Sequence, residues 1–338
     1  MTTTTTTPRS RRRAMMRIVG ASLAISLCTT FQFWLSNHQS PPAAGQSWTD
    51  SGSLRGRSLS AVDVSSLRCR IPREYRLSKN PISPTYVASY DSGSEVVSNL
   101  VQALTGIATT TQVNYAPRRA ERSVLLETHY PLQGSLKIRD EENFRGAILL
   151  LRNPITAILA SYNTFASRQY RYSADVVRAS EEEWIRYRDS AFASQVKQYE
   201  RFVTHWMNKY EENREDLLLI PYEGLTGGKG AIFTKQIGNF LDKTEGINIL
   251  DPDSIPCIWE KFVHDQWYPD GDDASPSTTT SFQERADDRP LKQNHLHMVS
   301  GMLQGLDERF GNDDRQFSTI MKSYLKGLYE YSVVAVAS

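Results

Sequence analysis

The stretch TYVASYDSGSEVV, Thr85 to Val97, reads as a strand, a Ser/Gly turn and the start of a helix. A turn of this kind directs backbone N–H groups and the positive end of the helix dipole toward an anion. Such turns usually bring a lysine or an arginine to the anion as well, whereas this one carries Asp91 beside Ser92-Gly93-Ser94. The stretch therefore predicts a phosphate-binding turn with an unexpected acid beside it.

Apolar runs alternate with helical patterns along the chain after this turn. Four runs are expected to form strands: Thr85–Tyr90, Ser123–Pro131, Gly146–Pro154 and Asp216–Leu225. Apolar strands separated by helices indicate a parallel sheet that is covered on both faces. Ligands of such sheets bind at the carboxyl ends of the strands. Ser92, His129, Arg152 and Glu223 all follow those ends, which predicts one shared site.

The helical patterns fill the intervals between and after these strands. They cover Glu95–Gly106, Thr156–Gln169, Ser190–Glu212, Asn294–Gly311 and Phe317–Val336. The segment Tyr268–Pro290 has no apolar period and is expected to form a loop. TGGKGA, Thr226–Ala231, lacks the spacing of a phosphate-binding P-loop and is expected to form a turn.

The N-terminal region differs in composition from the rest of the chain. Residues 1–17 carry arginines and no acid, and residues 18–37 carry no charged side chain. This order predicts a type II signal anchor with a cytosolic tail; a cleaved signal peptide and an organelle transit peptide are the alternatives. Residues 38–80 are rich in Ser, Gly and Pro and are expected to form a flexible stem. Residues 81–338 then form the lumenal domain.

Net charge and cysteine content limit the partners and the compartment. The formal net charge of +1 gives no reason to expect nucleic acid as a partner. Cys28 lies in the predicted anchor, which leaves Cys69 and Cys257 either as a lumenal disulfide or as two free thiols. The oligomeric state cannot be read from these features.

Four motifs, SYDSGS, LETHYP, AILLLRNP…SYN and LLLIPYEGL, occur in the order and spacing of the sulfotransferases. The chain most resembles the membrane-anchored branch that includes the WSC-domain-containing sulfotransferases and algal-type relatives, although it has no WSC module. The resemblance covers about Tyr86 to Leu225. It implies a P-loop-like, three-layer α/β fold on a Golgi type II membrane protein, with a secreted or organelle-targeted protein as the alternative. It also implies transfer of a sulfuryl group from PAPS to a carbohydrate, protein or small-molecule acceptor, with PAP as product and no metal.

The resemblance also assigns roles to individual residues. It implies donor binding by the turn and the helix that follows it, and by an arginine and a serine further along the chain: Ser92, Gly93, Ser94, Glu95, Arg152 and Ser161. The arginine would grip the 3′-phosphate, because a planar guanidinium suits bidentate phosphate binding. The serine is displaced, since the family has it eight residues after the arginine, where this chain has Ala160.

His129 in LETHYP matches the general base of the family, and imidazole suits that task near neutral pH. Two lysines that the cytosolic sulfotransferases have are absent: either Asp91 stands at the first position or the loop is one residue shorter, and Glu127 stands at the second. The nearby cations that could offset these acids are Arg118, Arg119, Arg122, Lys137 and Arg139. A catalytically weakened member, or a binding protein that keeps the fold, is therefore one alternative.

A second alternative enzyme uses a different motif. Asp270 and Asp272 form a DxD sequence, which binds Mn²⁺ in lumenal glycosyltransferases, and carboxylate oxygens suit that ion. His295 and His297 are two residues apart, so they face different sides of a helix and are poorly placed to share a metal.

Overall fold

The computed structural model describes residues 69, 71–90, 93–111, 116–132, 144–170, 181–264 and 291–337. The chain divides into two units, Met1–Ser60 and Ala61–Ser338, and every described residue belongs to the second. The predicted anchor and most of the predicted stem thus lie outside the described residues. Among the helices that are described, none is both long enough and apolar enough to cross a membrane.

The described part consists of a parallel sheet and helices. Its elements are β1 (Thr85–Ser89), α2 (Ser94–Thr105), β2 (Thr110–Thr111), α3 (Pro117–Ala120), β3 (Leu125–Thr128), β4 (Gly146–Leu151), α4 (Pro154–Tyr170), α5 (Glu181–Lys209), η4 (Arg214–Asp216), β5 (Leu217–Pro221), α6 (Tyr222–Thr226), α7 (Gly230–Asp242), η5 (Pro252–Ser254), α8 (Ile255–Trp259), η6 (Glu260–His264), α11 (Gln293–Phe310) and α12 (Arg315–Ala337).

The sheet has five strands in the order β2-β3-β1-β4-β5, and every neighbouring pair is parallel. Thr85 at the start of β1 pairs with both Leu125 and Gly146, so β3 and β4 flank β1 in a common register. The carboxyl ends of these three strands therefore meet at one edge. The predicted parallel α/β sheet is confirmed.

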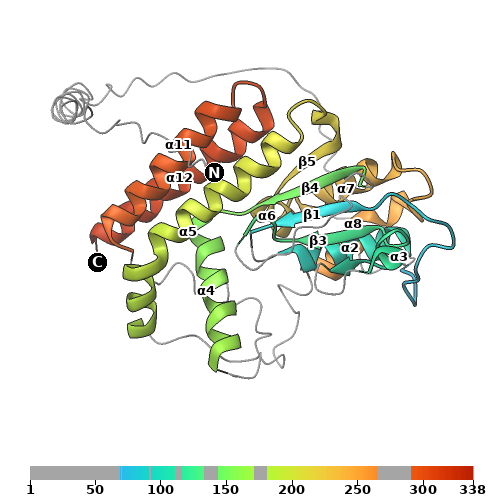
Figure 1. The fold of residues 1–338 in the computed structure, drawn as a ribbon, viewed down its shortest axis with the longest axis horizontal. Coiled ribbons are helices and arrows are strands. Elements are labelled where there is room, and N and C mark those ends of the chain that lie inside the picture. Colours follow the sequence, from blue (N-terminus) through green and yellow to red (C-terminus); the bar gives the residue numbers. More distant parts are fainter. Residues whose placement is uncertain are drawn as a thin grey trace, which may run out of the picture. The chain divides into compact units, whose positions relative to one another are not determined.

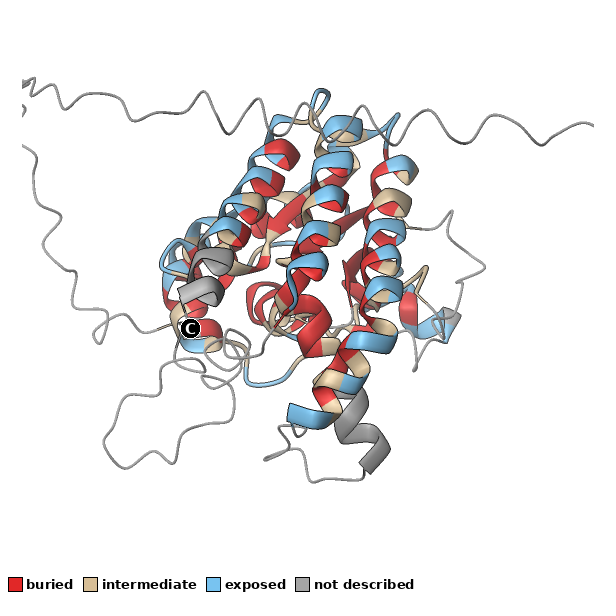
Figure 2. Ribbon diagram, turned by 90° about the vertical axis from the view of Figure 1, so that its left-hand side faces the viewer, coloured by how far each residue is buried: buried red, intermediate tan, exposed pale blue. Residues whose placement is uncertain are grey.

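Helices cover both faces of the sheet, which makes three layers (Figure 1). Successive residues of β4 alternate between two cores: Ala147, Leu149 and Leu151 pack with α4, α5, α11 and α12, whereas Ile148 and Leu150 pack with α2, α7 and α8. α11 packs against both α5 and α12. Figure 2 shows the buried residues along one side of these helices and the exposed residues along the other.

Several element boundaries differ from the sequence expectation, and two of these differences have a clear physical reason. α5 begins at Glu181 instead of Ser190, because three glutamates in its first turn suit the positive end of the helix dipole. Its apolar stripe also starts earlier, at Trp184, which is fully buried. β5 ends at Pro221, which has no N–H to continue the ladder, and Tyr222 begins the short helix α6.

The end of the predicted stem packs on the domain. Cys69 forms a disulfide with Cys257 in α8, with the Cα atoms 5.8 Å apart. Arg76 exchanges backbone hydrogen bonds with the segment after α2: its N–H donates to Gly106 O and its carbonyl accepts from the N–H of Ala108. The disulfide was one of two alternatives left open by the sequence, and the structure contains it.

Candidate active site

The turn between β1 and α2 depends on Gly93. This residue has φ +91°, a left-handed conformation that side chains rarely adopt. A Cβ atom there would also lie 2.8 Å from Cε2 of Tyr222 and 3.1 Å from Cδ2 of Leu150. Only glycine therefore allows the backbone to pass this close to β4 and α6. Asp91 and Ser92 lie outside the described residues.

The first turn of α2 already contacts a carboxylate. The Ser94 hydroxyl donates to Oε2 of Glu127 at 3.1 Å, and the Ser98 hydroxyl donates to Oε1 at 2.6 Å. Both serines are buried, and Glu127 is half-buried on β3. Glu127 thus holds the start of α2 against β3. Glu95 is exposed in the same first turn.

His129 directly follows β3, and its ring is fixed by the end of β1. Its Nδ1 lies 3.0 Å from the carbonyl oxygen of Ser89 and 3.4 Å from the Ser89 hydroxyl. A carbonyl oxygen only accepts, so Nδ1 carries the proton in this hydrogen bond. Nε2 of the neutral ring then keeps its lone pair. This is the tautomer that a general base needs.

Arg152 follows β4 and is 8% exposed. Its Nε donates to Oγ1 of Thr156 at 3.3 Å, and its Cζ lies 4.6 Å from the ring centroid of Tyr222. That ring also contacts Gly93, so one aromatic side chain separates the guanidinium from the β1–α2 turn. Burial raises the pKa of the Tyr222 hydroxyl, and the charge of Arg152 opposes this shift. Tyr222 was not identified from the sequence, although it lies in the LLLIPYEGL motif.

Side chains from three helices fix the backbone that carries Arg152. Tyr199 of α5 donates its hydroxyl to Arg152 O at 2.7 Å. The Tyr324 hydroxyl of α12 lies 3.0 Å from both Leu151 O and Oε2 of Glu223. The other Glu223 oxygen, Oε1, accepts the N–H of Asn153 at 2.7 Å. Burial raises the pKa of both tyrosines, and the nearby Glu223 charge adds to the shift.

The remaining residues that the sequence analysis named for the site have fewer contacts that bear on their predicted roles. Ser161 is half-buried in α4, directly after the buried Ala160, and its predicted donor contact stays a prediction. The arginines expected to offset the charges of Asp91 and Glu127 do not lie at the edge that carries His129. Arg118 and Arg119 lie in α3, and Arg122 donates a hydrogen bond to Ser78 O. All three precede β3 and so lie at its amino end, opposite His129. Lys137 and Arg139 lie outside the described residues.

A cavity of about 800 Å³ also lies at that opposite edge. Its lining includes Pro84 and Arg145, which immediately precede β1 and β4, and Glu121, which precedes β3. It is therefore separate from the candidate site at the carboxyl ends.

The histidine pair does not form a metal site among the residues that the structure describes. No group of three or more His, Cys, Asp or Glu side chains is close enough there to hold an ion. His295 is buried and His297 is exposed, as expected for residues two apart on a helix. Asp270 and Asp272 lie outside the described residues.

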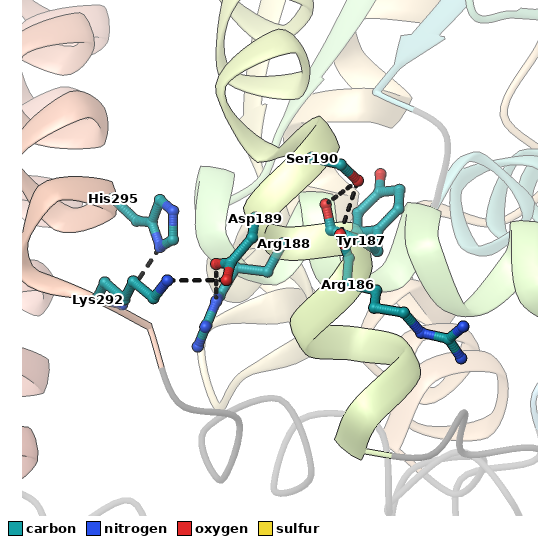
Figure 3. Close-up of polar contacts among 7 residues, drawn as sticks. All are labelled: Arg186, Tyr187, Arg188, Asp189, Ser190, Lys292 and His295. Atoms are coloured by element: carbon teal, nitrogen blue, oxygen red, sulfur yellow. Dashed lines mark hydrogen bonds and ion pairs between the residues drawn. The ribbon is translucent and has the colours of Figure 1, made fainter.

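His295 instead belongs to a polar cluster that joins α5 to α11 (Figure 3). Asp189 accepts hydrogen bonds from Arg188 Nε at 2.9 Å and from Lys292 Nζ at 2.8 Å. These two bonds lower the pKa of Asp189 to about 2. The backbone N–H of Lys292 donates to Nδ1 of His295 at 3.2 Å. The cluster fixes the chain where it enters α11.

Comparisons with known proteins give a distant structural likeness. No model of a known protein family matches the chain, and no curated protein matches it. Among solved structures, mouse sulfotransferase SULT7A1 complexed with PAP is similar to the chain, with a TM-score of 0.45 and 13% sequence identity. The match covers 74% of this chain and 91% of that chain. A likeness at this level assigns neither a family nor an activity.

Proposed function

We propose that the chain is a sulfotransferase that uses PAPS to sulfate a hydroxyl or an amine of a carbohydrate, protein or small-molecule acceptor. The observation that carries the proposal is the meeting of three groups at one sheet edge. His129 follows β3, Arg152 follows β4, and the N-terminus of α2 follows β1 between them. The ordered motifs of the sequence supply the same three groups in the same roles.

The proposed donor site has two parts. The N-terminal N–H groups of α2 and the turn at Gly93 suit the 5′-phosphosulfate, because they combine free backbone donors with the positive end of the helix dipole. Arg152 suits the 3′-phosphate, with Ser161 as its predicted partner. Tyr222 lies between the two parts and contacts both.

The proposed reaction is an in-line displacement at sulfur. The acceptor oxygen or nitrogen attacks the sulfur atom, and the bond from sulfur to the 5′-phosphate oxygen breaks with its electron pair leaving on PAP. The acceptor proton passes to Nε2 of His129, whose lone pair is left available by the Nδ1–H bond to Ser89 O. Donors fixed in advance at the leaving phosphate stabilise the developing charge.

We also propose that the protein works in the Golgi lumen behind an N-terminal type II anchor. The Cys69–Cys257 disulfide supports an oxidising compartment, since such bonds are rare in the cytosol. The anchor itself remains a prediction from residues 18–37.

A non-catalytic binding protein is the second candidate, and one observation favours it. The carboxylate of Glu127 accepts a hydrogen bond from Ser94 at the start of α2. Its negative charge there would repel PAPS, which is also negatively charged. The third candidate is a Mn²⁺-dependent glycosyltransferase that would use Asp270 and Asp272, both outside the described residues.

Binding of PAP to the full-length chain tests the donor site, followed by transfer of ³⁵S from labelled PAPS to glycan and peptide libraries. We expect PAP to raise the melting temperature of wild type and of the Arg145→Ala control, which changes an exposed arginine at the other end of β4. Arg152→Gln should lose this shift. Absence of a PAP shift in wild type would reject the proposal, whereas PAP binding without any ³⁵S transfer would favour the non-catalytic candidate.

A further inference from the structure

We infer that Glu223, Tyr324 and Tyr199 form a positioning network for Arg152 and thereby set how strongly the chain distinguishes a 3′-phosphorylated nucleotide from one without that phosphate. This role presupposes the proposed donor site, in which Arg152 binds the 3′-phosphate. None of the three side chains needs to contact the nucleotide itself.

The network acts on three consecutive backbone units. Leu151 O, Arg152 O and Asn153 N each have a side-chain partner, and the three partners come from α12, α5 and α6. These units form the junction where β4 ends and α4 begins at Pro154. The direction of the Arg152 side chain depends on this junction, because its Cα lies at the centre of it.

The same network fixes the surface on which the guanidinium lies. Glu223 follows Tyr222 directly in α6, and the ring of Tyr222 lies 4.6 Å from Cζ of Arg152. The bond between Glu223 and the N–H of Asn153 therefore joins the segment that carries the arginine to the segment that carries its aromatic platform. A displacement of either segment would shift the guanidinium relative to a bound phosphate.

Burial makes the network rigid. Tyr199 and Tyr324 are 1% and 5% exposed, and both rings belong to the core on the α5 side of the sheet. A buried hydroxyl that loses its partner cannot exchange it for bulk water, so each bond is costly to break. A rigid donor placed before the ligand arrives binds a phosphate more tightly than one that must be ordered on binding.

The single proton of the Tyr324 hydroxyl distinguishes two substitutions of Glu223. That proton is shared between Leu151 O and Oε2 of Glu223. In Glu223→Gln, the amide oxygen can accept from Asn153 and the amide N–H can donate to Tyr324, whose proton is then free for Leu151 O. Glutamine thus preserves the network, and Glu223→Ala removes it.

The test measures dissociation constants of the full-length chain for PAP and for adenosine 5′-phosphate, which lacks the 3′-phosphate. We expect Glu223→Ala, Tyr324→Phe and Tyr199→Phe to weaken PAP binding by about tenfold, as for loss of one buried hydrogen bond to a binding group. Binding of adenosine 5′-phosphate should stay within about twofold, and Glu223→Gln should retain most of the preference for PAP.

Gln316→Ala is the matched control, because the Gln316 side chain also ties α12 to a strand carbonyl, Leu219 O at 2.9 Å, but on β5. It should lose stability without losing the preference for PAP. The inference is overturned if the variants keep the wild-type preference, or if Gln316→Ala loses it equally. If Glu223→Ala does not fold, Tyr324→Phe and Tyr199→Phe still test the inference. A wild type without any preference for PAP would instead reject the proposed donor site, and this inference with it.

Discussion

Replacement of Glu127 should strengthen donor binding, although this carboxylate now makes two hydrogen bonds. Its Oε2 lies 3.1 Å from the Ser94 hydroxyl at the start of α2. The one proton of that hydroxyl goes to Glu127, so an anion beside Ser94 would be held by the backbone N–H groups at the start of α2, about 6 Å from the carboxylate. The two negative charges then repel each other within the proposed site.

The size of the effect follows from the separation and the surroundings. At about 6 Å and an effective dielectric constant of about 20 to 40, two unit charges repel by about 1.4 to 2.8 kcal/mol. This range corresponds to roughly 10- to 100-fold in the dissociation constant. Since Glu127 is half-buried, we expect Glu127→Gln to strengthen PAP binding at pH 7.5 by about tenfold, near the lower limit.

Isothermal titration of PAP into the full-length chain measures this change. Glu121→Gln is the matched control, because it removes an exposed carboxylate from the segment before β3 at the opposite edge of the sheet. Equal or weaker PAP binding by Glu127→Gln, with Glu121→Gln like wild type, would refute the electrostatic reasoning. Glu127→Lys should bind PAP more tightly still, but at a loss of about 1–3 kcal/mol in stability, since the buried Ser94 and Ser98 hydroxyls lose their acceptor.

Three further predictions concern stability. Gly93→Ala should lower the free energy of unfolding by about 2–3 kcal/mol in urea titrations, through its left-handed backbone and the contact with Tyr222. Burial lowers the pKa of His295, so folding favours its neutral form. Its contribution to the free energy of unfolding should be complete above about pH 6.5 and decline as the pH falls. His295→Gln should therefore flatten the loss of stability between about pH 7.5 and 5.5. Cys257→Ser should lower stability by about 2–5 kcal/mol, because the disulfide closes a loop with a sequence separation of 188, and a reductant should bring wild type to the same level.

Local patterns were sufficient to predict the four longer strands and the edge at which the candidate site lies. Four of the five strands are short apolar runs, and their parallel connection follows from the helices between them. The edge strand β2, two threonines, has no such pattern and was not predicted. The positions of His129, Arg152 and Glu223 at the carboxyl ends then required no knowledge of distant contacts. For this reason the prediction that the carboxyl ends of these strands lie at one edge of the sheet agrees with the structure.

Contacts between distant segments could not be predicted in the same way. Arg122 is only seven residues from His129, but a strand of extended backbone intervenes and places it at the opposite edge. Tyr199 and Tyr324 fall on the apolar stripes of their helices and look like core residues, since nothing in the pattern marks a buried hydroxyl that bonds to a strand carbonyl. The partners of Glu127 are 29 and 33 residues away, on another element.

The two glutamates at the sheet edge should therefore have opposite effects on donor binding. Glu127 accepts from two serine hydroxyls, which can rotate toward an incoming phosphate once the carboxylate is gone. Glu223 accepts from the backbone N–H of Asn153, which cannot turn toward a ligand on its own. Without this acceptor, the backbone beside Arg152 loses a restraint. Removal of the first charge should free donors for the ligand, and removal of the second side chain should disorder Arg152, the arginine that we propose binds it. A donor site that tightens in Glu127→Gln and weakens in Glu223→Ala would thus separate repulsion of the donor from positioning of Arg152 within a single protein.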